Sequence, residues 1–161
     1  MRKVLPVLAI GASVAFASAQ AQTVKPDPCA PPDQHLAAQV LKLHTEMMVV
    51  SLTCINEMND RDLSRKYKKF MDTNTPLIMR SQAMMIEALK SSAAFDTWWT
   101  ELSNSEQMKV NQFTPSTYCS IHEPQFRDVV NAPPDRFERY ATMVSKRARF
   151  SACEAGRQPA G

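Results

Sequence analysis

Glycine is almost missing from this chain, and its absence narrows the possible folds more than any other feature. The three glycines stand at positions 11, 156 and 161, so residues 22–155 contain none. Tight hairpin turns of the primed types, phosphate-binding loops and dinucleotide-binding fingerprints all rely on glycine, because their backbones need positive φ angles or a close approach. The sequence therefore predicts an all-α fold in which prolines mark the ends of helices.

The segment 41–54, LKLHTEMMVVSLTC, belongs to the clearest predicted helix. Asp33 is expected to cap this helix, which then carries apolar residues at alternating spacings of four and three: Leu36, Val40, Leu43, Met47, Val50 and Cys54. That spacing forms one apolar seam along a helix that packs against others. Further apolar residues make the helix apolar nearly all round: Leu41, Met48, Val49, Leu52 and Ile55. We expect other helices to surround it; a partner covering one face is the alternative.

The middle of the chain allows two interpretations. Residues 62–74 and 76–94 form either two helices or one bent helix. The two-helix interpretation takes Thr75 as an N-cap and Pro76 as the first helical residue, a combination that is typical of helix starts.

The second half of the chain predicts two more helices. One runs over 96–113 with Asp96 at its start, and a last one runs from Asp135 to residue 150. Between them, TPSTYCSIHEP at 114–124 is expected to be a loop or short turn. The predicted fold is an up-and-down bundle of four to five helices, stapled by disulfides.

The first 19 residues have the pattern of a secretory signal peptide. Arg2 and Lys3 precede an apolar run at 4–16, and small residues follow it, with cleavage expected after Ala19. The apolar run is too short to cross a bilayer as a finished helix. We therefore expect a periplasmic or secreted protein that carries no transmembrane segment after cleavage.

Removal of this segment changes the charge of the chain. Of 19 basic residues two are lost, so 17 stand against 16 acidic residues and the net charge falls from +3 to +1. Binding of nucleic acid needs a concentrated basic surface, which this balance does not indicate. The remaining chain is expected to comprise a proline-rich segment at 20–32, the bundle domain at 33–155 and a disordered tail at 156–161.

Four widely spaced cysteines, Cys29, Cys54, Cys119 and Cys153, follow the signal segment. An even, widely spaced set in an exported protein indicates two disulfides, whereas zinc sites use close cysteine pairs. A helix over 33–54 is roughly 31 Å long, so Cys29 should not reach Cys54. The preferred pairing is Cys54 with Cys119 and Cys29 with Cys153. The runner-up is Cys29 with Cys119 and Cys54 with Cys153.

One pair of side chains is suited to a soft metal. His44 and Met48 lie one helical turn apart, and an imidazole with a thioether is compatible with Cu(I). The competing interpretation, which the seam favours, is that these methionines fill a helical core. A haem is not expected, because C-x-x-C-H is absent and His122 falls in the predicted loop. We expect no cofactor.

Motifs for catalysis are missing. The sequence contains neither G-x-S-x-G nor H-E-x-x-H, and its carboxylates are scattered along predicted helix faces.

The densest charge cluster is RDLSRKYKKF at 61–70, and its basic residues are Arg61, Arg65, Lys66, Lys68 and Lys69. It predicts an amphipathic basic helix that either forms a solvated outer face or contacts an anionic surface or an acidic partner.

The signal peptide, the segment LHTEMMVVSLTC, the Tyr67 and Phe70 stripe and the pair Tyr118-Cys119 together resemble small exported helical proteins of proteobacteria that carry no assigned function. This resemblance implies an exported helical domain and transfers no catalytic residue. We therefore expect a non-catalytic binding or interaction module of the cell envelope, monomeric or homodimeric, whose partner is an envelope protein or an anionic surface. The alternatives are a periplasmic copper-binding protein and an envelope hydrolase without a recognisable motif.

Overall fold

The computed structural model describes residues 31–155, with side chains as far as residue 144. This part of the chain contains no strand and folds into five helices: α1 (Pro32–Thr53), α2 (Leu63–Leu89), α3 (Ser92–Gln112), α4 (Pro115–Val130) and α5 (Pro134–Ala155). The predicted all-α fold is confirmed. The expected signal peptide at 1–19, most of the proline-rich segment at 20–32 and the tail at 156–161 lie outside the described residues.

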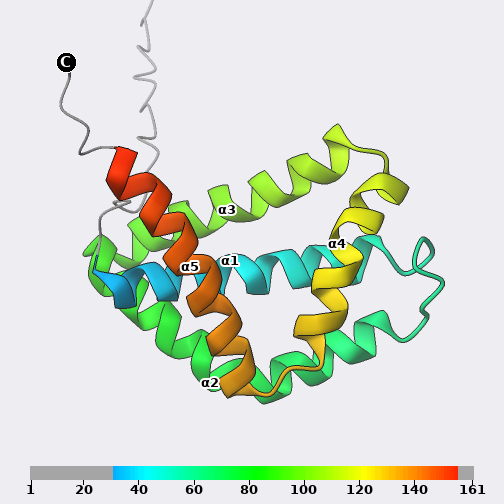
Figure 1. Ribbon diagram of the computed structural model, residues 1–161, viewed down its shortest axis with the longest axis horizontal. Helices are drawn as coiled ribbons and strands as arrows, with labels where there is room; N and C mark the ends of the chain where they lie inside the picture. Colours follow the sequence, from blue (N-terminus) through cyan, green and yellow to red (C-terminus); the bar gives the residue numbers. More distant parts are fainter. Residues whose placement is uncertain (1–30, 156–161) are drawn as a thin grey trace, which may run out of the picture.

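Helix α1 is the centre of the bundle and packs against each of the other four helices. Its predicted seam is buried from Val40 onwards, with Val40, Leu43, Met47, Val50 and Cys54 at most 1% exposed, and Leu36 at its start is partly buried. Helices α1, α2 and α3 run back and forth, while α4 and α5 cross α1 obliquely on one side (Figure 1). The expectation that other helices surround the middle of the first helix is therefore confirmed, whereas Leu52 near its end is 69% exposed. No helix among the described residues is long and apolar enough to span a membrane.

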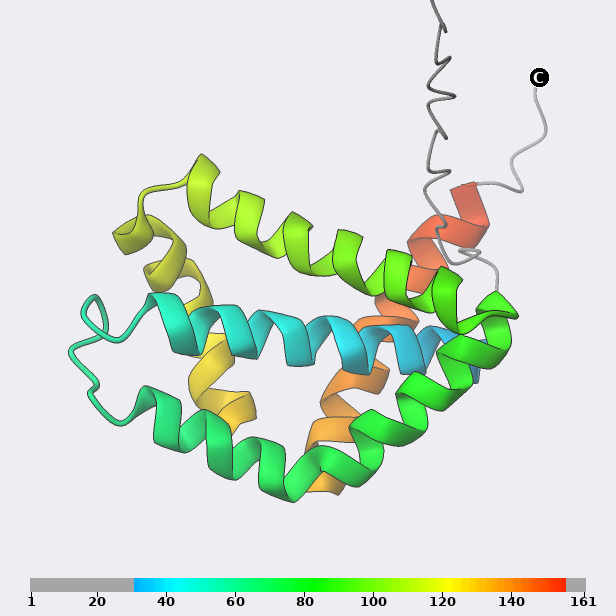
Figure 2. The same cartoon turned by 180° about the vertical axis from the view of Figure 1, so that it is seen from behind.

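Helix α2 is one bent helix, which decides between the two interpretations of this region. Pro76 lies inside it, and Thr75 is not a cap, because its hydroxyl donates to the carbonyl oxygen of Met71 at 2.6 Å. A proline removes one backbone hydrogen bond and bends a helix, and Figure 2 shows the bend near the middle of α2. The buried Asn74 beside it donates to the carbonyl oxygen of Ala132, at 3.5 Å, and so ties the bend to the turn before α5.

The boundary between α2 and α3 lies earlier than predicted. Lys90, with φ of 58°, ends α2 in the left-handed conformation that glycine usually supplies at this position. Ser91 then caps α3, since its hydroxyl oxygen accepts from the backbone N–H of Ala94 at 3.2 Å. The predicted helix start at Asp96 is wrong. A lysine that ends a helix in the left-handed conformation gives no sequence signal, because glycine is the residue expected there.

The predicted loop at 114–124 is also wrong, since these residues begin α4. The hydroxyl oxygen of Thr114 accepts from the backbone N–H of Thr117 at 3.3 Å, and Pro115 occupies the first turn. Proline is well suited to that position because a first-turn N–H has no intrahelical partner. Pro124 is accommodated inside the helix, so His122 lies on α4 and not in a loop.

Neither of the two predicted aspartate caps is at a cap position, since the N-cap residue of α1 is Pro31 and α5 already begins at Pro134. Helix α1 begins at Pro32 and α5 at Pro134, so Asp33 and Asp135 lie in the first turns of their helices. In the first turn, their carboxylates interact favourably with the positive end of the helix dipole.

A disulfide joins Cys54, which caps the C-terminal end of α1, to Cys119 of α4, with a Cα–Cα distance of 5.6 Å. The first half of the preferred pairing is therefore confirmed, and the runner-up pairing is wrong. The returning α3 helix delivers α4 to the end of α1 where Cys54 lies, as the bundle order predicts. Cys29 and the side chain of Cys153 lie outside the described part of the chain, so their pairing stays a prediction.

Candidate functional site

A group of polar side chains meets between α1, α3 and α4, close to the disulfide. We call it the polar cluster, and its members are Glu46 of α1, Glu106 and Lys109 of α3, and Tyr118, His122 and Gln125 of α4. Buried polar groups of this density are unusual in a small helical core, where apolar side chains normally fill the space.

Glu106 is the most deeply buried carboxylate of the polar cluster, with 1% of its surface exposed. Its Oε1 accepts a hydrogen bond from Nζ of Lys109, one turn further along α3, at 2.5 Å. Its Oε2 is buried and has no hydrogen-bond partner among the described residues. One oxygen of a buried carboxylate is thus paired, and the other is not.

Glu46 approaches the same lysine from α1. Its Oε1 lies 4.0 Å from Nζ of Lys109, and its Oε2 accepts a hydrogen bond from Nε2 of Gln125 at 2.7 Å. Lys109 therefore stands between two carboxylates, and Gln125 fixes one of them to α4. Two carboxylates against one ammonium leave a net charge of −1.

Tyr118 is fully buried beside these carboxylates, and its hydroxyl has no hydrogen-bond partner within the described residues. Burial, followed by the negative charges of Glu106 and Glu46, raises the pKa of Tyr118 above its usual value. The ring of His122 packs on Tyr118, with 4.4 Å between the ring centroids. Burial lowers the pKa of His122, so its imidazole is neutral at pH 7 and leaves the net charge unchanged.

The disulfide holds the elements of the polar cluster in place. Cys119 directly follows Tyr118 on α4, and Cys54 lies about two turns beyond Glu46 at the end of α1. The two cysteines are 65 residues apart in the sequence. The covalent link between α1 and α4 keeps Glu46 of α1 close to Tyr118 and Gln125 of α4.

The predicted copper ligands lie elsewhere, towards α2. His44 is buried, its Nε2 is 2.9 Å from the hydroxyl oxygen of Tyr67, and its ring centroid is 5.8 Å from that of Trp99. Its Nδ1 is buried with no partner among the described residues. Burial lowers the pKa of His44 to about 4, so the ring is neutral at pH 7. Met48 lies one turn further along α1 and is partly buried.

No group of three or more histidine, cysteine, aspartate or glutamate side chains that could hold a metal occurs in the described part of the chain. The proposed Cu(I) site would therefore depend on His44 and Met48 themselves, and the pair stays a prediction.

Acidic neighbours pair with most of the predicted basic segment. Arg65 contacts Asp62 at 2.6 Å, Lys68 contacts Asp72 at 2.8 Å, and Lys66 contacts Asp60. Arg61 and Lys69 make no ion pair with any residue that the structure describes. The segment is an exposed face on which three of five positive charges are locally compensated, and its contact with an anionic surface stays a prediction.

A cavity of about 480 Å³ lies between α4 and α5 and is lined by Asp128, Val129, Ala132, Arg136, Arg139, Tyr140 and Met143. Arg139 already pairs with Asp135 at 2.7 Å, and both side chains are about two-thirds exposed. Solvent competes strongly for such groups, so this cavity offers less selective chemistry than the polar cluster.

Sequence reasoning missed the polar cluster because its members come from three helices. The three members on α4 fall at 118–125, mostly within the segment expected to be a loop, and Glu106 with Lys109 resembles an ordinary surface pair three residues apart. The start of α4 was the available signal, since Thr114 followed by Pro115 is a helix-start pattern. Burial of Glu106 has no counterpart in the local sequence.

The chain was compared with family models, curated proteins and solved structures, and none of them matches it.

Proposed function

We propose that the protein is an exported, non-catalytic binding module of the cell envelope, and that the polar cluster is where a small polar ligand binds. One observation carries the proposal: Oε2 of Glu106 and the hydroxyl of Tyr118 are both buried in the same cluster and both lack a partner. Leaving a buried polar group unsatisfied costs about 1 to 3 kcal/mol, and more for a charged group. A ligand that bonds to both groups recovers this free energy on binding, and in its absence water would fill the same role.

Two features support export. Residues 1–19 have the arrangement of a secretory signal peptide, with basic residues before an apolar run and small residues after it. The Cys54–Cys119 disulfide is the kind of bond that persists in oxidising compartments.

The chemistry of the polar cluster supports binding over catalysis. The phenolate form of Tyr118, which a tyrosine base or nucleophile would need, is disfavoured because burial and two carboxylates raise its pKa. Cys54 and Cys119 are joined in a disulfide and neither is a free thiol. The carboxylates of Glu46 and Glu106 both contact Lys109. These two neighbouring carboxylates are the feature that the alternative function, an envelope hydrolase, would require.

Cell fractionation tests export. Expression of the full chain in a Gram-negative bacterium should place it in the periplasm or the medium, and mass spectrometry should find it shortened at its N-terminus. A variant that lacks residues 2–19 should stay in the cytoplasm. Cytoplasmic retention of the intact chain of 161 residues would contradict export.

Nuclear magnetic resonance tests binding at the polar cluster. The ¹⁵N-labelled protein, recovered after expression of the full chain, is titrated separately with four small probes: ethylammonium, acetate, acetamide and ethanol. At least one probe should shift backbone amide signals next to Glu46, Glu106 and Tyr118 in a saturable way. Absence of such shifts for all four probes would contradict the binding function, and turnover of an ester or glycoside panel would favour the hydrolase alternative.

A further inference from the structure

We infer that the polar cluster binds a small organic cation, an ammonium group attached to a hydrocarbon part, with the unpaired carboxylate oxygen of Glu106 as its anchor. This inference rests on the proposed binding function and names the class of its ligand. The polar cluster differs from an ordinary surface ion pair because its central carboxylate is almost completely removed from solvent.

The charge of the polar cluster is the first argument. Glu46 and Glu106 contribute two negative charges, and Lys109 is the one cation within 4.0 Å of them among the described residues. Gln125 is uncharged, and the half-buried imidazole of His122 is neutral at pH 7. A buried excess of one negative charge is unfavourable in a medium of low dielectric constant, and a ligand with one positive charge removes it.

The unpaired atoms are the second argument. An ammonium group has N–H donors and no acceptor, so it can donate to Oε2 of Glu106 and also to the hydroxyl oxygen of Tyr118. Both unpaired groups are acceptors toward such a ligand, so the donors of an ammonium group match them in kind. An anion would be repelled by the two carboxylates. A neutral alcohol or amide would satisfy the hydrogen bonds without compensating the negative charge.

A divalent metal ion fits the polar cluster less well. Calcium and magnesium require about six oxygen ligands, whereas one oxygen of each carboxylate here is already engaged by Lys109 or Gln125. An organic cation needs fewer oxygen partners, because an ammonium group has only three N–H donors to satisfy.

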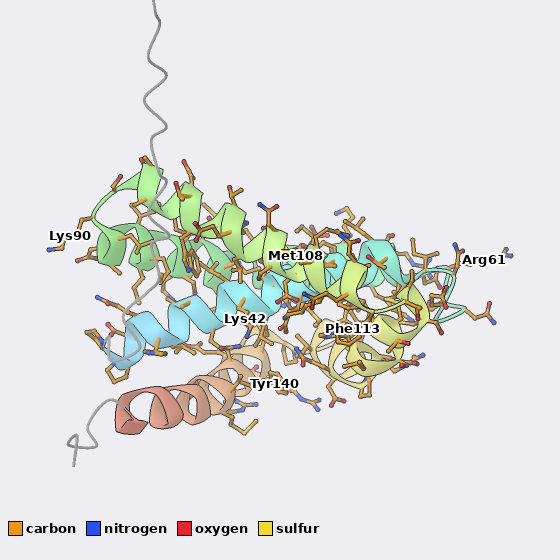
Figure 3. The ribbon with its side chains drawn as sticks, turned by 90° about the horizontal axis from the view of Figure 1, so that it is seen from above. Lys42, Arg61, Lys90, Met108, Phe113 and Tyr140 are labelled. Carbon is orange, nitrogen blue, oxygen red and sulfur yellow. A yellow bond between two sulfur atoms is a disulfide. The ribbon has the colours of Figure 1, made fainter. Side chains whose placement is uncertain are left out.

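The surface beside Lys109 offers a place for the hydrocarbon part. The side chain of Lys109 is 35% exposed, so this side of the polar cluster faces solvent. Phe113 follows Lys109 by one turn of α3, and a residue at that spacing lies on the same face. Phe113 is 45% exposed, and Figure 3 shows it at the end of α3 that leads into α4. A ligand with its ammonium group at Glu106 would place an apolar tail along this edge.

The experiment compares the four probes by amide chemical shifts, because they have similar size and differ in charge. A two-carbon ligand has few atoms to contribute, so its Kd lies at about 1 mM or weaker, and the titration extends to about 50 mM at constant ionic strength. Ethylammonium should shift amides around Glu106 and Tyr118, whereas acetate, acetamide and ethanol should not. Glu106→Gln should weaken ethylammonium binding by about tenfold or more, the loss expected when a charge-assisted hydrogen bond is removed.

Two further variants complete the test. Glu57→Gln removes an exposed carboxylate outside the polar cluster and should leave the ethylammonium Kd unchanged. Tyr118→Phe keeps the ring, removes the unpaired hydroxyl and should weaken ethylammonium about threefold to tenfold, which serves as the test if Glu106→Gln does not fold.

Each alternative outcome separates the two proposals. Shifts at the polar cluster with acetate, acetamide or ethanol but not with ethylammonium would overturn the cationic ligand and keep the binding function. Equal ethylammonium affinity in the wild type and in the folded variants of Glu106 and Tyr118 would also overturn it. No saturable shift with any probe would overturn both.

Discussion

His44 should make the protein unstable in mild acid. Its ring is buried between α1, α2 and α3, and burial lowers its pKa to about 4, against 6.5 for an exposed histidine. Between these two pH values the unfolded chain binds a proton that the folded protein does not, so the free energy of unfolding falls as the pH falls. The contribution of His44 is complete above pH ~6.5 and lost at pH ~4, at about 1.4 kcal/mol per pH unit, or about 3 kcal/mol in total.

Urea unfolding at several pH values between 7.5 and 4 measures this contribution, through the difference between the wild type and His44→Gln. The difference is used because other groups also contribute to the pH dependence, among them His122, whose pKa burial lowers as well. The variant should show a shallower loss of stability, by about 3 kcal/mol over the range. Tyr67→Phe is the matched control: it removes the hydrogen-bond partner but keeps the ring, and it should retain the wild-type pH dependence because burial causes the shift. Identical pH dependence in the wild type and His44→Gln would refute the reasoning.

Three further results are expected. Replacing both Cys54 and Cys119 by alanine should lower the free energy of unfolding by up to about 4 kcal/mol, because the disulfide closes a long loop in the unfolded chain; guanidinium denaturation measures it, and an unchanged midpoint would contradict it. If the copper alternative is right, Cu(I) competition with a chelator should show binding that His44→Ala and Met48→Leu each abolish, and equal binding in the variants would exclude this pair. The basic segment 61–70 should bind anionic vesicles weakly, because aspartates pair with three of its basic side chains, and this binding should be lost at physiological salt; co-sedimentation that does not depend on salt would contradict this.

The helical fold and its centre could be predicted because both depend on periodic patterns. The seam that includes Leu43 and Met47 is apolar at helical spacing, and it is buried. The Cys54–Cys119 disulfide followed from the length of that helix and the alternating directions of its neighbours. Helix ends were less predictable where an uncommon residue takes a special role, as Lys90 does in the left-handed conformation that ends α2.

The polar cluster could not be predicted, since its character arises from contacts between distant segments. Glu106 and Glu101 are indistinguishable along the sequence, yet the approach of α1 and α4 leaves Glu106 1% exposed and one of its oxygens without a partner. In the same way, the aspartates that pair with three basic side chains of the basic segment are ordinary neighbours whose pairing depends on side-chain geometry.

Local patterns thus suffice for an all-α chain with an apolar first helix, since helix formation and burial of a stripe depend on spacing within about 20 residues. The position of a charge relative to solvent, and of one polar atom relative to another, depends on how whole helices meet. Because α3 and α4 pack against α1, Glu106 of α3 and Tyr118 of α4 are buried, and each keeps one polar atom without a hydrogen-bond partner among the described residues. The unpaired polar atoms on which the proposed ligand site depends accordingly arise where three helices meet, and no single stretch of the sequence contains them.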